Sequence, residues 1–286
     1  MKYRMLGVDL DGTLLNSQGR VSSQNLAALR RAQDAGVLVV PCTGRAWRES
    51  HRALADAAHL ELGVFVTGAS VSEMPTGRPL DTATMAPDLA WNIVCALRDL
   101  PEAVLVYRDS HRAGHDYLVT GRGQLTANTR WWFEHTRAMV HHQPEIDRDD
   151  LHHTLRVGTV SSRERLDAVM PQLRAMCGDQ IVTHAFAGLH LPDQHVQLYV
   201  MEVFARGVDK WRGLQWVARQ HGIADDEIAV IGDEVNDLPM FERSSCAIAM
   251  GNAAEPVRHA ARYITLTNDE HGVAHAIDML LTEKWT

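Results

Sequence analysis

The sequence predicts an α/β protein in which a doubly wound parallel sheet carries an inserted α+β domain. Short apolar runs alternate with helical patterns at the start of the chain, which is typical of a parallel sheet with helices on both faces. The same alternation returns in the last third of the chain. Between these parts, strand-like runs follow one another with only occasional helices, which favours an antiparallel sheet.

The first segment of the core begins with a buried strand that ends in acidic residues and Gly12. The following helix has Leu26, Leu29 and Ala32 at helical spacing, with Ser22 as a capping residue. The expected elements, in order, are strand 3–9, helix 22–35, strand 37–40, helix 45–59 and strand 63–66.

The middle of the chain opens with a hairpin over residues 69–80, which turns at Pro75, Thr76 and Gly77. Its later elements predict an antiparallel sheet with helices packed on one side. They are helix 88–99, strands 104–109 and 116–121, a helix around 131–133, strand 155–160, helix 161–176, and strands 181–186 and 196–204.

The last third of the chain is expected to complete the sheet of the first segment. Its elements are helix 208–221, strand 228–233, helix 237–243, strand 247–250, a helix from Ala254, strand 263–265 and helix 272–281. We therefore assign residues 1–81 and 201–286 to the core domain and residues 82–200 to the inserted domain.

Composition narrows the classes of function. The net charge of −8, from 28 basic and 36 acidic residues among 286, disfavours nucleic-acid binding, which calls for a basic surface. The four cysteines form no CxxC pair and indicate buried thiols in a reducing compartment. No stretch approaches the roughly 18–20 apolar residues of a membrane span, and none resembles a signal peptide. We expect a cytoplasmic protein.

The chain has sixteen histidines, and two pairs have the i, i+4 spacing that could hold a metal on a helix. These pairs are His111 with His115, and His271 with His275. The first pair contains Gly114 and lies between strand-like runs, and neither pair forms an HExxH motif. We interpret these histidines as solvated or core residues rather than zinc ligands.

Polar residues follow three of the predicted core strands at the points where the strands end. Asp9 and Asp11 close the first strand, Thr43 follows the second, and Asp233 and Asp237 follow the strand at 228–233. In open α/β sheets, ligands bind at the carboxyl ends of the strands. Turn formation explains any one of these residues, but their joint placement predicts a single crevice.

Gathering these carboxylates requires a cation. Two carboxylates about 4 Å apart repel by about 4 kcal/mol at an effective dielectric constant of 20. Oxygen ligands favour a hard ion, and Mg²⁺ is the usual choice near phosphate. Lys210, which opens the helix after the insert, can pair with the carboxylates and with a phosphoryl group. By itself, a lysine at a helix start is most often solvent-exposed.

Four motifs carry a resemblance to a known family. DLDGTLL, TGR, GVDKWRGL and GDEVNDLPM, in that order, resemble the motifs of the haloacid dehalogenase (HAD) superfamily. The tail from MGNAAEP to AHAI is similar to that of the Cof-type, or class IIB, branch. The resemblance covers residues 1–80 and 201–286. It implies a Rossmann-like core, and it implies that the insert is the α+β cap domain of that branch.

The resemblance implies a role for each matching residue. Asp9 is similar to the nucleophile that attacks phosphorus, and Asp11 to the general acid and base. Thr43 would donate a hydrogen bond to a phosphoryl oxygen. Lys210 would hold the nucleophile and the phosphoryl charge. These roles agree with chemistry in which a carboxylate nucleophile divides one difficult displacement into two easier ones.

The resemblance also implies a metal site and a substrate site. Asp233, the Asp9 side chain and the Asp11 backbone carbonyl would bind Mg²⁺, and Asp237 would be a further ligand or a supporting residue. The substrate-binding residues implied by the motifs are Thr43, Gly44, Arg45, Lys210 and Asn236.

These observations predict a Mg²⁺-dependent phosphatase that acts on a small phosphorylated metabolite, such as a sugar phosphate. One alternative is a phosphotransferase or mutase that passes the phosphoryl group to a second hydroxyl. A non-catalytic regulatory protein on the same scaffold is the other, and it predicts loss of Asp9, Asp11, Lys210 or Asp233, all of which are present. Oligomeric state is not predicted.

One stretch departs from the branch. The usual Asn-Gly-Ala after the third strand is replaced here by Thr67-Gly68-Ala69. The loop is expected to keep its turn and to contact substrate differently.

Overall fold

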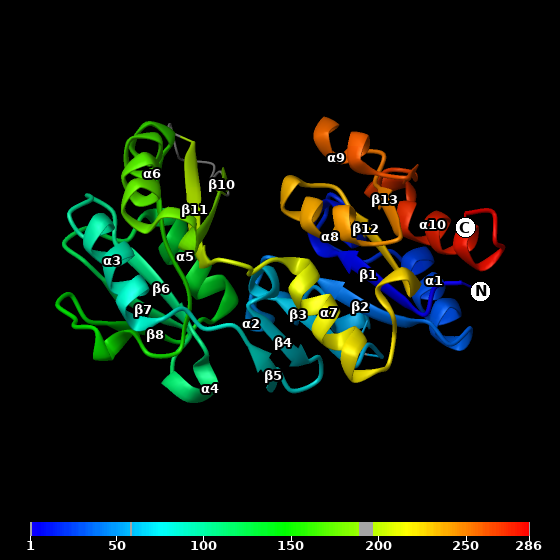
Figure 1. The fold of residues 1–286 in the computed structure, drawn as a ribbon, viewed down its shortest axis with the longest axis horizontal. Helices are drawn as coiled ribbons and strands as arrows, with labels where there is room; N and C mark the ends of the chain where they lie inside the picture. The colour runs from blue at the N-terminus through cyan, green and yellow to red at the C-terminus, as the bar shows by residue number, and fades with distance from the viewer. Residues whose placement is uncertain (1, 58, 189–196, 286) are drawn as a thin grey trace. The chain divides into compact units, whose positions relative to one another are not determined.

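Two sheets organise the chain, one in each of two structural units (Figure 1). This computed structural model describes residues 2–57, 59–188 and 197–285. The core unit comprises Met1–Asp81 and Asp209–Thr286, and the cap unit comprises Thr82–Val208. The second boundary therefore follows residue 208, whereas the sequence analysis set it after residue 200. The physical reason is that strand β11 (Leu198–Ala205) pairs with two strands of the cap sheet.

The core sheet has the strand order β14-β13-β12-β1-β2-β3-β4-β5. Neighbouring strands are parallel from β14 through β3, and β3 and β4 form an antiparallel pair. The strands are β1 (Met5–Asp9), β2 (Leu38–Cys42), β3 (Leu62–Phe65), β4 (Ser70–Glu73), β5 (Pro79–Thr82), β12 (Ile228–Gly232), β13 (Cys246–Ala249) and β14 (Tyr263–Ile264). The sheet confirms the predicted fold class, with β1 at its centre.

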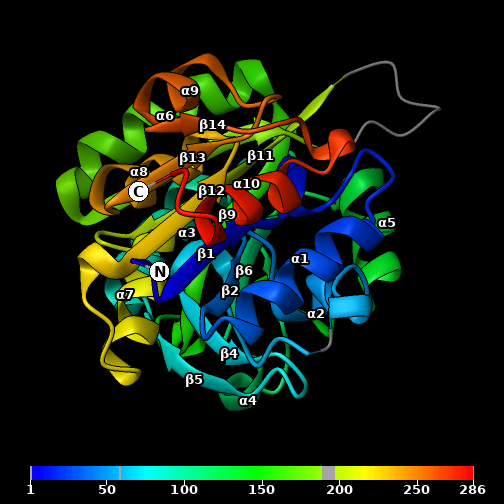
Figure 2. The same cartoon turned by 90° about the vertical axis from the view of Figure 1, so that its right-hand side faces the viewer.

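Helices cover both faces of the core sheet, as the apolar strands require. Figure 2 shows α7 (Lys210–Gln220) and α8 (Leu238–Arg243) on one side and α1 (Ser23–Asp34) and α10 (Gly272–Leu281) on the other. A shorter helix, α9 (Glu255–Ala260), precedes β14. The N-terminus of α7 is fixed by Asp209, whose carboxylate accepts a hydrogen bond from the Arg212 backbone N–H at 2.8 Å.

One predicted helix is much shorter than expected. The pattern over 45–59 predicted a single helix, but the structure has α2 over Trp47–Ser50 and a 3₁₀ turn at Ala55–Ala57. The Glu49 carboxylate accepts the Ala46 backbone N–H at 2.8 Å, which caps the start of α2. No proline or glycine marks its end, so helical periodicity alone overestimated its length.

The cap sheet has the order β10-β11-β9-β6-β7-β8, and its paired strands are antiparallel except β7 and β8. Its remaining strands are β6 (Val104–Arg108), β7 (Tyr117–Thr120), β8 (Val140–His142), β9 (Thr154–Ser162) and β10 (Ile181–Ala187). Its helices are α3 (Pro87–Leu97), α4 (Ser110–Ala113), α5 (Ala127–Thr136) and α6 (Arg163–Cys177).

The core of the cap unit lies between one face of this sheet and helices α3 and α6 (Figure 1). The prediction of helices on one side is wrong for α5, which packs against the other face. Leu118 belongs to this core, whereas its neighbour Tyr117 points to the opposite face and contacts Phe133 of α5 at 4.7 Å between ring centroids. The sequence analysis did not predict β8 or α4, because three or four residues are too few to establish a period.

Two further features bear on the sequence analysis. All four cysteines are free thiols. Within residues 2–57, 59–188 and 197–285, every helix is too short or too polar to cross a membrane.

Candidate active site

The core sheet brings the predicted polar residues to one edge. Strand β1 lies between β2 and β12 and runs parallel to both, so the carboxyl ends of the three strands are adjacent. Asp9 is the last residue of β1 and pairs in register with Cys42 of β2. Thr43 and Asp233 are the first residues beyond β2 and β12. This edge is where open α/β sheets bind their ligands.

Three of these side chains form a buried group, which consists of Asp9, Lys210 and Asp237. Lys210 Nζ lies 2.5 Å from Asp9 Oδ1 and 2.5 Å from Asp237 Oδ1. The Lys210 and Asp237 side chains are fully buried, and that of Asp9 is 6% exposed. Lys210 is the first residue of α7 and directly follows Asp209, the N-cap residue of that helix.

The charges of the buried group are not balanced. Asp233 lies beside it, so three carboxylates face a single ammonium group. Burial raises the pKa of Asp9 well above its usual value. The charge of Lys210 lowers this pKa, and the charges of Asp237 and Asp233 offset part of that lowering. Burial alone would lower the pKa of Lys210, but attraction to Asp237 and Asp9 raises it instead. The lysine is therefore held charged, and the formal negative charges of the three carboxylates exceed its charge by two.

A divalent cation fits this imbalance. Carboxylate oxygens of Asp9, Asp233 and Asp237 lie within 4.8 Å of one another. Burial is the main cause that raises the pKa of Asp233 to about 6. Oxygen-only donors with two excess negative charges suit a hard divalent ion such as Mg²⁺.

The three carboxylates differ in what their oxygens already bind. Asp237 Oδ1 accepts from Lys210, and its Oδ2 accepts from the backbone N–H groups of Asp233 and Glu234 at 2.9 and 3.1 Å. Asp233 Oδ1 accepts from the Thr13 hydroxyl at 2.7 Å. On Asp9, Oδ1 accepts from Lys210 Nζ at 2.5 Å, and the Asp9 and Asp233 carboxyls also interact with each other. Proximity alone would make Asp237 a ligand, but its occupied oxygens fit a supporting role better.

Asp11 and Arg45 form a second group, which we call the exposed pair. Arg45 Nε donates to Asp11 Oδ2 at 2.7 Å, and its Nη2 donates to Asp11 Oδ1. The Asp11 side chain is 52% exposed and that of Arg45 is 29% exposed. The structure thus places the Asp11 carboxylate at the solvent side of the site and outside the three-carboxylate cluster.

The remaining predicted residues lie around the same edge. Lys210 Nζ lies 3.5 Å from Asn236 Oδ1. The Thr43 hydroxyl accepts the Arg45 backbone N–H at 3.1 Å. A side-chain carbon at Gly44 would lie 3.4 Å from Thr67 Oγ1 and 4.0 Å from Asn236 Nδ2. Gly44 and Asn236 are therefore neighbours.

Thr67 is a site residue that the sequence analysis singled out only as a departure from the branch. It is buried, and its φ of 54° follows a φ of 52° at Val66. Two consecutive β-branched residues in the left-handed region are unusual, and such backbone strain concentrates at functional sites. The next residue, Gly68, has a φ of 91°, and a side chain there would collide with the Asp209 carbonyl.

Two contacts that the sequence analysis missed hold the loop after β1. Gly12 has a φ of 75°, and a side chain there would collide with the Asp233 carboxylate. The Asn252 amide donates to the Gly12 carbonyl at 2.8 Å. Asn252 lies just beyond β13, the next strand along the sheet, and this position at a strand end was the available signal.

The sequence is similar to those of known haloacid dehalogenase-like hydrolases over nearly its whole length. The sequence model of the haloacid dehalogenase-like hydrolases matches residues 6–277. The putative phosphatase YxeH of Bacillus subtilis (strain 168) is 28% identical, and the alignment covers 99% of this chain and 100% of YxeH. The 5-amino-6-(5-phospho-D-ribitylamino)uracil phosphatase YwtE of the same organism is 27% identical, with 99% of each chain covered.

Solved structures match the whole fold. A haloacid dehalogenase-like hydrolase from Bacteroides thetaiotaomicron superimposes with a TM-score of 0.77 at 24% identity, covering 97% of this chain and 99% of the other. A sugar phosphatase of HAD subclass IIB gives a TM-score of 0.73 at 20% identity, covering 97% and 98%.

Proposed function

The chain belongs to the haloacid dehalogenase-like hydrolases as a Cof-type phosphatase, and from this premise we propose that it hydrolyses a small phosphomonoester through a phospho-aspartate on Asp9. The observation that carries the proposal is the buried group. Asp9 ends the central strand, and Lys210, itself held by Asp237, fixes one of its carboxylate oxygens at 2.5 Å. We propose that the other oxygen is the one that attacks phosphorus.

The proposed reaction has two steps. In the first, a carboxylate oxygen of Asp9 forms a bond to phosphorus, the bond from phosphorus to the alcohol oxygen breaks, and Asp11 gives that oxygen a proton. In the second, Asp11 takes a proton from water as the water oxygen attacks phosphorus, and the bond to Asp9 breaks. The exposure of Asp11 suits this role, since alcohol leaves and water enters on the solvent side.

The neighbouring residues would bind and orient the phosphoryl group. Lys210 supplies a fixed positive charge, and Thr43, Gly44 and Asn236 supply polar groups at the same edge. Arg45 lies beside Asp11, where it would contact the substrate. Positioning and charge neutralisation are the main demands of phosphoryl transfer.

The proposal includes Mg²⁺, held by the side chains of Asp9 and Asp233 and the backbone carbonyl of Asp11. When bound, it would neutralise charge on the phosphoryl oxygens. Asp237 would support the site by holding Lys210 and the backbone of the Asp233 loop. The two uncompensated negative charges of the cluster support this part of the proposal.

For the substrate, we propose a phosphorylated sugar or a similar polyol-bearing metabolite. The relative YwtE is named for a phosphoribityl compound, and one structural neighbour is a sugar phosphatase. The net charge of −8 disfavours nucleic acid as a partner. Four free thiols suit a reducing cytoplasm.

A phosphate-release screen tests the proposal. Sugar phosphates, nucleotides and cofactor phosphates would be incubated with the protein and Mg²⁺ in the absence of any acceptor alcohol. We expect phosphate release from one class above the rest, and its loss when a chelator is in excess. Release that persists in excess chelator would contradict the metal role. Transfer only to an added alcohol would favour the phosphotransferase alternative.

A further inference from the structure

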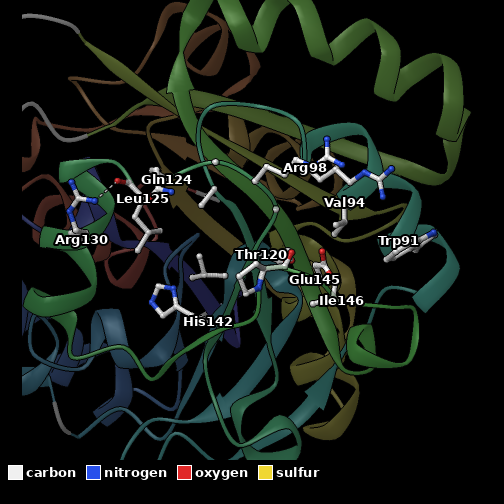
Figure 3. Close-up of a pocket in the computed structure, with 16 residues that line it drawn as sticks. Trp91, Val94, Arg98, Thr120, Gln124, Leu125, Arg130, His142, Glu145 and Ile146 are labelled. Carbon is white, nitrogen blue, oxygen red and sulfur yellow. Dashed lines mark hydrogen bonds between the residues drawn. The ribbon is translucent and has the colours of Figure 1, made fainter.

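The cap unit contains a cavity of about 730 Å³ whose 16 lining residues all belong to the cap unit (Figure 3). Its volume lies within the range of small-molecule sites. Four segments form most of its walls: the C-terminal part of α3, the end of β7 with the loop after it, the start of α5, and residues 142–146 from the end of β8. The residues proposed for catalysis belong to the core unit, so none of them lines the cavity.

The cavity is positively charged in an acidic protein. Its lining includes three arginines, Arg98, Arg122 and Arg130, against the single carboxylate of Glu145, which gives a formal charge of +2. The whole chain has a net charge of −8. A concave surface lined by one sign of charge concentrates ligands of the opposite sign.

Two of the three guanidinium groups keep their charge uncompensated. Arg122 forms an exposed ion pair with Asp99 at 2.9 Å. Arg130 Nη1 donates to the neutral Leu125 carbonyl at 2.5 Å, and Arg98 forms no ion pair with the described residues. Arg98 and Arg130 are therefore available for an anion, and guanidinium forms strong charge-assisted bonds with phosphate and carboxylate.

The cavity also offers an apolar surface next to its charges. Trp91, Val94 and Arg98 lie at i, i+3 and i+7 of the same helical stretch, so they share one face. Figure 3 shows these three at one end of the cavity and Arg130 with Leu125 at the other. A ligand with a flat or apolar body would lie on Trp91 while its anionic group reaches an arginine.

Hydrogen bonds connect the chain segments that form the walls of the cavity. The Arg122 backbone N–H donates to the Arg98 carbonyl at 2.9 Å, which joins the loop after β7 to the end of α3. The Thr120 hydroxyl donates to the Pro144 carbonyl at 3.1 Å, which joins the end of β7 to the segment after β8. The site is thus formed before a ligand binds, and this lowers the entropic cost of binding.

We propose that this cavity binds a small organic anion with a flat or apolar body, the class that includes nucleoside monophosphates and aryl phosphates. The charge of the lining selects the anion, and Trp91 with its apolar neighbours selects the body. The full chain would carry two ligand sites, one in each unit.

Calorimetric titration tests the proposal with adenosine monophosphate and naphthyl phosphate as probes. The titrations use the full-length Asp9→Asn protein in excess chelator, so that neither turnover nor metal-dependent binding contributes heat. We expect saturable binding that weakens at least about tenfold in the Arg98→Ala/Arg130→Ala variant, since two charge-assisted bonds are lost. Arg174→Ala, an exposed cap arginine outside the cavity, is the matched control and should bind as the parent does.

Three results would overturn the proposal. The first is an absence of saturable binding for both probes at millimolar concentration. The second is an equal affinity in the double-arginine variant, once circular dichroism has shown it to be folded. The third is inorganic phosphate binding as tightly as the probes, because a role for Trp91 requires the organic body to contribute affinity.

Discussion

Two ion-paired groups lie at the carboxyl end of the core sheet, and they differ in burial and in the number of partners. The buried group joins Lys210 to two carboxylates, and the Lys210 side chain is 0% exposed. The exposed pair joins Asp11 to Arg45 in a forked contact, with Asp11 52% exposed. Both groups have short contacts between opposite charges, but water reaches only the exposed pair.

The difference follows from desolvation. Removing one member of a buried pair leaves an uncompensated charge that water cannot reach, at a cost of about 3–5 kcal/mol. Exposed pairs contribute about 0–1 kcal/mol because water and salt screen them. The buried group is therefore both structural and chemical, whereas the exposed pair is free to serve the reaction without supporting the fold.

The largest expected effect comes from Asp9→Asn. The variant keeps the shape of the side chain and removes the nucleophile, so turnover should fall by about a thousandfold or more. Phosphate release measures it, with far-ultraviolet circular dichroism to verify folding. Asp34→Asn, at an exposed aspartate of α1, should keep full activity. Normal turnover by Asp9→Asn would remove Asp9 from the mechanism.

Lys210→Met tests the structural side of the buried group. The change removes the ammonium group from between two buried carboxylates, so the free energy of unfolding should fall by about 3–5 kcal/mol and activity should be lost. Urea unfolding measures the change, and Lys284→Met, at an exposed lysine, should unfold as the parent does. A loss below about 1 kcal/mol in the free energy of unfolding would show that the buried group contributes no more to stability than an exposed pair.

A pair of glycine variants isolates the contact between the first loop and Asp233. Gly12 and Gly19 have φ of 75° and 70°, but a side chain at Gly12 would meet the Asp233 carboxylate, whereas space around Gly19 is open. Gly19→Ala should cost about 1–2 kcal/mol from backbone strain alone. Gly12→Ala should cost more and should also reduce turnover. Equal effects of the two variants on unfolding and activity would contradict the tight packing around Asp233.

Arg45→Ala tests the exposed pair. The free energy of unfolding should change by less than about 1 kcal/mol, because the pair is accessible to solvent. KM should rise severalfold if Arg45 contacts substrate. Thermal unfolding and steady-state kinetics measure the two quantities, and Arg258→Ala serves as an exposed control. A stability loss as large as that of Lys210→Met would erase the distinction between the two groups.

Thr67→Asn should have the smallest effect. Asn adopts the left-handed region more readily than a β-branched residue, so the change at a φ of 54° should stabilise the fold by up to about 1 kcal/mol. Its effect on substrate preference in the phosphate-release screen would show how the Thr67 hydroxyl, near Gly44, contributes to the site. Destabilisation would indicate that the buried hydroxyl makes a contact worth more than the strain.

The core was predictable because strand ends and motifs coincide. Asp9, Thr43 and Asp233 each follow an apolar run, and in a parallel sheet those positions share one edge whatever the loops do. The burial of Lys210 was less predictable, because a lysine at a helix start is most often exposed. Only its neighbouring motif indicated a functional position.

The details that the sequence left open depend on tertiary packing. Both oxygens of Asp237 are occupied by Lys210 and backbone N–H groups, a pattern that no spacing rule encodes. The Asn252 contact joins segments 240 residues apart. The cap unit ends at residue 208 rather than at the predicted residue 200, because β11 pairs with the strands of the cap sheet. Short elements such as β8 have no period to detect.

The central claim is that Asp9 carries the phosphoryl group, and acid-quench mass spectrometry tests it most directly. In Asp11→Asn protein with nitrophenyl phosphate, the good leaving group needs no acid, but release of the intermediate still needs a base. The account predicts a phosphoryl group that accumulates on the peptide containing Asp9. Turnover with no phosphorylated peptide, or with the phosphoryl group on another residue, would contradict it.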